Sequence, residues 1–98
     1  MRKIVYQIIW SPIAELTYLE TISFILENWT VKEASDFEEK VESLLNLLKT
    51  QKNLCPPSKH EKHLRRCVIT TQTSLIYQFS KDTIEIVAFF DNRSDHEF

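Results

Sequence analysis

The chain has 98 residues, of which 43% are hydrophobic and 27% charged, which is ordinary for a one-domain globular protein with a modest core. It carries a formal net charge of −2 and contains no glycine. A phosphate-cradling loop, a dinucleotide-binding fingerprint and a nucleophile elbow are therefore excluded, because each needs glycine where the backbone approaches a ligand or takes a positive φ.

The first expected element is a strand over residues 4–10, in which apolar residues alternate at Ile4, Tyr6, Ile8 and Trp10. A helix follows, with Ser11 as its N-cap and Pro12 at its first position. Apolar residues recur along this helix at intervals of three and four, which predicts a stripe facing the core. The stripe consists of Ile13, Leu16, Leu19, Ile22, Leu26 and Trp29.

A second helix is expected from Thr30, which has capping-box spacing to Glu33. The connection between the helices is so short that they should form an antiparallel hairpin. The predicted core stripe of the second helix is Phe37, Val41, Leu44, Leu45 and Leu48.

Residues 51–63 read as a loop, because Pro56-Pro57 continues neither a helix nor a central strand. Three strands follow at about 64–71, 74–80 and 84–90, with Ser80–Thr83 as the last turn. The order predicts a single α+β domain over residues 1–98. It would contain an N-terminal strand, an antiparallel helical hairpin and three antiparallel strands.

Charge is unevenly distributed along the chain. Residues 12–48 hold eight acids and two bases, whereas residues 49–66 hold six bases and a single acid, Glu61. We interpret residues 49–66, the basic segment, as a surface for a polyanion or an acidic protein segment. The alternative interpretation is a solvated face that binds nothing.

The two cysteines, Cys55 and Cys67, are expected to be free thiols of a cytoplasmic protein, since disulfide scaffolds of this size usually carry more cysteines. No apolar run approaches the roughly 20 residues of a membrane helix. Cys55, His60, His63 and Cys67 are ligand-type residues for zinc, but their spacing is not a familiar zinc pattern. We therefore expect no metal and no cofactor.

The strand ending in Trp10-Ser11-Pro12, the acidic helices, the basic loop and the closing strands LIYQF and IEIVAFFDNR together resemble the RelE/ParE superfamily. This resemblance covers essentially the whole chain. It implies the toxin of a bacterial type II toxin–antitoxin module, also called a plasmid stabilisation protein. Such a toxin inhibits growth and is neutralised by a cognate antitoxin, whose C-terminal segment wraps it in a hetero-oligomer.

The resemblance implies two alternative targets. RelE-like members cut mRNA on the ribosome, and their pattern makes Arg65, Arg93 and His96 the candidate catalytic residues. ParE-like members instead inhibit DNA gyrase. Ser74 stands where RelE-like enzymes carry an arginine, and a chain ending at Phe98 has no C-terminal helix with a functional tyrosine. A ParE-like or degenerate mechanism is therefore favoured.

Two alternatives stay open. The first is a ribosome-dependent endoribonuclease, which leaves the question of enzymatic activity undecided. The second is a non-toxic binding module that retains the fold. The candidate residues for binding nucleic acid or another target are Lys59, Lys62, Arg65, Arg66 and Arg93. Neighbours on a strand point to opposite faces of a sheet. We expect Arg65 and Arg93 to share the open face and Arg66 to pair with helix acids.

Overall fold

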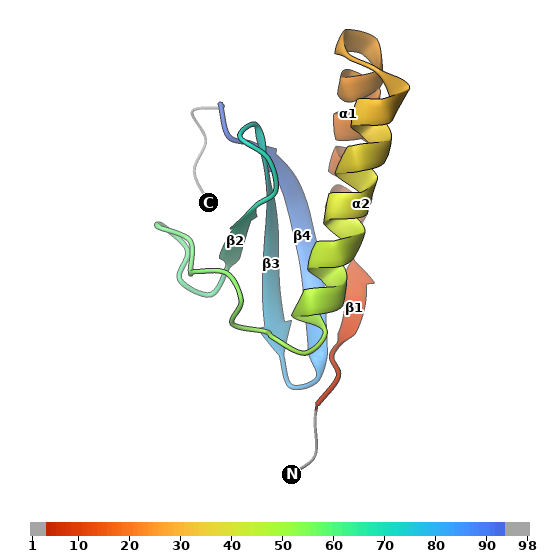
Figure 1. Cartoon of the computed structure of the whole chain (residues 1–98). Coiled ribbons are helices and arrows are strands. Elements are labelled where there is room, and N and C mark those ends of the chain that lie inside the picture. Colours follow the sequence, from red (N-terminus) through yellow and green to blue (C-terminus); the bar gives the residue numbers. More distant parts are fainter. Residues whose placement is uncertain (1–3, 94–98) are drawn as a thin grey trace.

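In a computed structural model that describes residues 4–93, two helices cover one face of a four-stranded sheet (Figure 1). The elements are β1 (Gln7–Trp10), α1 (Pro12–Asn28), α2 (Val31–Leu48), β2 (Arg65–Val68), β3 (Thr73–Ser80) and β4 (Thr83–Asp91). The strand order is β1-β4-β3-β2, with β1 parallel to β4 and the other neighbours antiparallel. The α+β prediction is confirmed.

Local signals position both helices as predicted. The Ser11 Oγ accepts a hydrogen bond from the Ala14 amide at 2.9 Å, and Pro12 opens α1. The Thr30 Oγ1 accepts from the Glu33 amide at 3.2 Å at the start of α2. The turn between β3 and β4 also falls where expected, and without glycine Lys81 takes the positive φ of 47° that this turn requires.

The predicted core stripe of α1 is wrong. Of its members, only Ile22 packs against the core, while Leu19 keeps 63% of its surface exposed. The other four are exposed as well: Ile13, Leu16, Leu26 and Trp29. The face of α1 that meets the sheet instead carries Ala14, Tyr18, Ile22 and Ile25.

The edge of β4 explains this rotation of α1. β1 pairs only with residues 83–86, so beyond Ile86 the edge of β4 opposite β3 has no strand beside it. There the Ser11 Oγ donates to the Val87 carbonyl at 2.8 Å, and the Thr17 Oγ1 accepts from the Phe89 amide at 2.9 Å. Because buried backbone groups must be paired, these hydroxyls face the sheet and turn the leucines outward.

An aromatic cluster joins the hairpin to the sheet. Phe89 of β4 lies 5.5 Å from Trp10, 5.1 Å from Tyr18 and 6.4 Å from Phe37, measured between ring centroids. The predicted stripe of α2 is confirmed, because its members are either buried in this core or packed against it. Burial and edge-to-face or tilted contacts of these rings stabilise the packing of the hairpin on the sheet.

The cysteines are not free: Cys55 and Cys67 form a disulfide, with an S–S distance of 2.09 Å and a Cα–Cα distance of 5.3 Å. The expectation of free thiols is wrong because the loop after α2 folds back along β2. This places Cys55 opposite a strand residue to which no sequence pattern links it. Bridged sulfurs offer no thiolate to a metal, and residues 4–93 contain no cluster of metal-ligating side chains. Within the same residues, neither helix has the length and apolar composition needed to cross a bilayer.

Candidate functional site

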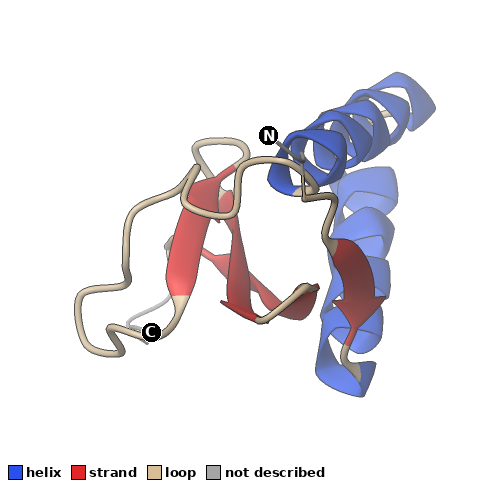
Figure 2. Cartoon of the chain, turned by 90° about the horizontal axis from the view of Figure 1, so that it is seen from below, coloured by secondary structure: helices blue, strands red, loops and turns tan. Residues whose placement is uncertain are grey.

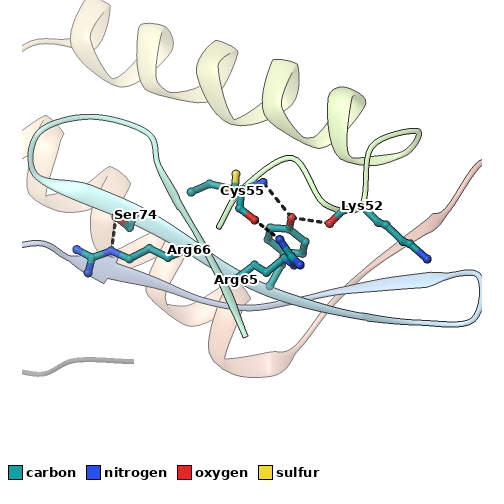
Figure 3. The surroundings of a disulfide bond; sticks show 7 residues. Lys52, Cys55, Arg65, Arg66 and Ser74 are labelled. Carbon is teal, nitrogen blue, oxygen red and sulfur yellow. Dashed lines mark hydrogen bonds between the residues drawn. A yellow bond between two sulfur atoms is a disulfide. The ribbon is translucent and has the colours of Figure 1, made fainter. Parts of the chain in front are cut away.

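Arg65 lies at the start of β2, on the side of the sheet that faces the hairpin. Its Nη1 donates to the Cys55 carbonyl at 2.6 Å, and its guanidinium lies 5.6 Å from the centre of the Phe79 ring. The Lys52 ammonium lies 5.0 Å from the same ring. Figure 3 shows Arg65 directed toward Cys55 and Arg66 directed away toward Ser74.

Arg66 occupies the open face of the sheet, opposite the hairpin, contrary to the expected pairing with helix acids. Its Nε donates to the Ser74 Oγ at 3.1 Å, and its Nη2 donates to the Asn92 Oδ1 at 2.6 Å. The guanidinium also lies 5.3 Å from the Phe90 ring. Ser74 is fully buried and itself donates to the Asn92 Oδ1 at 2.6 Å. The side-chain hydrogen bonds among Arg66, Ser74 and Asn92 therefore connect β2, β3 and the residue that follows β4.

Arg93 lies at the hairpin, not on the open face as expected. It forms a bidentate ion pair with Asp91, at 3.1 and 3.2 Å, and its guanidinium lies 5.5 Å from the ring of Phe24 in α1. Hydrogen bonds from Arg93 hold the pKa of the Asp91 carboxyl below its usual value.

The three arginines do not converge on one phosphate site. Arg65 stacks on Phe79, whereas Arg93 follows Asp91, which pairs with Thr73 at the other end of β3. Phe79 lies six positions along β3 from Thr73, a span of about 20 Å. The third candidate catalytic residue, His96, lies outside the described residues.

The remaining basic candidates lie in the loop. Lys59 and Lys62 are exposed, and nearby His63 lies 3.6 Å from the carboxylate of Glu61. The loop therefore presents positive charge to solvent at the edge of β2.

A groove that the sequence analysis missed runs between the helical hairpin and the turn that joins β2 to β3. Its volume is about 1450 Å³. Acidic residues outnumber the two bases, Lys40 and Arg93, in its lining: they are Glu20, Glu33, Asp36, Glu39 and Asp91. Its apolar lining is formed by Phe24, Ile25, Trp29, Phe37, Leu44, Leu47, Val68, Ile69 and Phe89.

Trp29 shows why this groove was missed. Helical periodicity placed Trp29 in the core stripe of α1, yet its side chain remains 46% exposed. In Figure 1 the hairpin extends beyond the strands at the end where the helices connect, so the sheet does not cover it there. Charge offered a usable signal, because α1 carries three glutamates and no basic residue.

Tyr77 links the loop to the sheet and supports a prediction on pH. Its hydroxyl donates to the Lys52 carbonyl at 2.7 Å and accepts from the Cys55 amide at 3.4 Å. Tyr77→Phe should cost about 1–3 kcal/mol at pH 7, because a part-buried carbonyl and a buried amide lose their partner.

Burial raises the pKa of Tyr77 above its ordinary value near 10, outweighing the opposite effects of the Cys55 hydrogen bond and of Arg65. Its contribution to stability is thus fully present below about pH 10 and is lost as the pH rises toward the folded-state pKa. Urea unfolding at pH 8 and pH 11 should show a steeper loss for the wild type than for Tyr77→Phe. Equal losses would contradict this role.

Comparisons with known proteins give a consistent result. The family model described as the ParE toxin of the type II toxin-antitoxin system, parDE, matches residues 8–96. Among curated proteins, no sequence matches significantly. A solved structure described as a chromosomal ParDE TA system from P. aeruginosa superposes with a TM-score of 0.73 at 10% identity. The alignment covers 89% of this chain and 96% of that one, and at this identity the likeness concerns the fold.

Proposed function

Because this chain belongs to the ParE toxin family of type II toxin–antitoxin systems, we propose that it inhibits bacterial growth and is neutralised by a cognate antitoxin bound in the groove. The groove carries this proposal, since it joins exposed apolar surface to a negative rim. Apolar anchors supply affinity to a helix laid in such a groove, and charges at the rim select the partner.

The charge of the groove specifies the antitoxin segment that it accepts. With five acids and two bases around an apolar floor, the groove fits an amphipathic helix with Lys or Arg on its flanks. An acidic stretch of the same antitoxin would instead meet the basic segment 49–66. A partner that contacts both the groove and the basic segment therefore carries a basic stretch and an acidic stretch. Its affinity should fall only modestly with salt, because apolar burial supplies most of the affinity.

For the target, we favour a ParE-like mechanism directed at DNA gyrase over cleavage of mRNA on the ribosome. Phosphoryl chemistry needs cations gathered at the developing charge. Arg65 and Arg93 lie at opposite ends of β3, and each already has a partner. We propose that the exposed Lys59 and Lys62 contact the target instead.

Expression of the chain in bacteria should arrest growth, and co-expression with its antitoxin should restore it. The double variant Lys59→Ala/Lys62→Ala should abolish the arrest while changing stability by no more than about 0.5 kcal/mol, because both side chains are exposed. Lys81→Asn is the matched control, since it removes an exposed charge and asparagine tolerates the positive φ at this turn.

Separate readouts of DNA damage and of translation identify the target. DNA damage with continued protein synthesis supports gyrase, whereas an immediate stop in translation supports the ribosome. Growth unaffected at high expression, with the antitoxin still bound, would replace the toxin proposal by a non-toxic binding module.

A further inference from the structure

The loop over residues 49–64 is the longest irregular segment among the described residues, and it lies along the outer edge of β2. The Ser58 amide donates to the Leu64 carbonyl at 2.7 Å, and the Arg66 amide donates to the Pro56 carbonyl at 3.1 Å. In Figure 1 this loop runs from the end of α2 to the edge of the sheet at β2, and in Figure 2 it extends past that edge. The loop thus covers a strand edge that would otherwise present unpaired backbone groups.

The Cys55–Cys67 disulfide ties this loop to the core. Cys67 lies in β2 opposite Leu75 of β3, and both are buried. Cys55 lies just before the residues that pair with the outer edge of β2, and its carbonyl receives the Arg65 guanidinium (Figure 3). One covalent bond therefore holds both the loop and the position of this arginine.

Besides the disulfide, the Tyr77 hydroxyl holds the start of the loop through Lys52 and Cys55, whereas residues 56–64 contribute few buried side chains. Within residues 49–64 only Cys55, Ser58 and Leu64 are buried. The buried Ser58 Oγ has no hydrogen-bond partner among the described residues, which weakens the closed loop because its desolvation is not compensated. A segment with so few buried contacts opens more readily than the strands beside it.

We propose that the disulfide is a redox-controlled latch: oxidised, it holds the loop against β2, and a dithiol reductant releases it. A thiolate of the dithiol attacks one sulfur, and its second thiol resolves the mixed disulfide. The chain gains two thiols while the reductant becomes a cyclic disulfide. Both cysteines are buried, and Cys55, at 9% against 3% exposed, is the one that opening of the loop uncovers first.

Release changes the presentation of the basic segment and leaves the groove intact. Two thiol sulfurs cannot remain at bonding distance, so Cys55 moves away from Cys67 and the pairing of Pro56 and Ser58 with β2 loosens. Lys59, Lys62 and Arg65 then lose their fixed positions. No residue of the 49–64 loop lines the groove. This inference holds whichever target the protein inhibits.

Hydrogen exchange of the full chain, with and without dithiothreitol, tests the latch. Mass spectrometry of each sample reports whether Cys55 and Cys67 are bridged or carry two thiols. Reduction should speed exchange about tenfold or more at the Ser58 and Arg66 amides, and leave the amides of β3 and β4 unchanged. The variant Cys55→Ala/Cys67→Ala should match the reduced wild type and be insensitive to dithiothreitol.

Three results would overturn the latch. The first is equal exchange of the loop amides in both redox states. The second is loss of protection throughout β3 and β4 on reduction. The third is a protein that still carries two thiols without dithiothreitol. The second result would make the bond a staple of the whole core instead of a local latch.

Discussion

Phe89→Ala will lower the free energy of unfolding by about 3–5 kcal/mol, the range for removing a buried phenylalanine from a core. Phe89 is 5% exposed and touches rings from β1, α1 and α2, so its loss leaves a cavity where the hairpin meets the sheet. Equilibrium denaturation in urea, with the midpoint and slope fitted together, gives the value.

Leu19→Ala is the matched control for this prediction. Helical periodicity places Leu19 in the core stripe of α1, whereas its 63% exposed surface predicts a change within about 0.5 kcal/mol. A loss of several kcal/mol at Leu19, with little change at Phe89, would mean that α1 presents its leucine face to the sheet.

Trp29→Ala will weaken antitoxin binding by about 30-fold or more, equivalent to about 2 kcal/mol, the level of an interface hot spot. Trp29 lines the groove and packs edge-on against Phe24, with ring centroids 5.6 Å apart, so it offers a rigid aromatic anchor. Titration calorimetry with the antitoxin or a peptide from its C-terminal segment measures the change.

Val31→Ala provides the comparison, because Val31 is 75% exposed and does not line the groove. Its affinity for the antitoxin should equal that of the wild type. If both variants bind equally well, the antitoxin occupies another surface, and the exposed leucines of α1 become the next place to look.

Features set by neighbouring residues were predictable. Ser11-Pro12 and Thr30 start the two helices, and Ser80–Thr83 forms the last turn, because capping and turn geometry act within a few residues. The stripe of α2 was also predictable, since its opposite face is polar and leaves one way to bury it.

The predictions that failed depend on contacts between distant segments and not on neighbouring residues. α1 is apolar on more than one face, so periodicity alone did not determine which face the sheet would take. The choice came from the unpaired edge of β4, which requires the hydroxyls of Ser11 and Thr17. The disulfide and the location of Arg93 likewise depend on segments that are distant along the chain.

By itself, the sequence determined the order of the elements, the caps and turns, the separation of acidic from basic segments and the resemblance to the RelE/ParE superfamily. Each of these is a local pattern or a sum of local patterns. Only the tertiary structure decided which face of α1 is buried, that Cys55 joins Cys67, and that Trp29 and several acidic residues line one groove. These outcomes follow from the pairing of backbone groups and the packing of side chains across the chain, which no local pattern specifies.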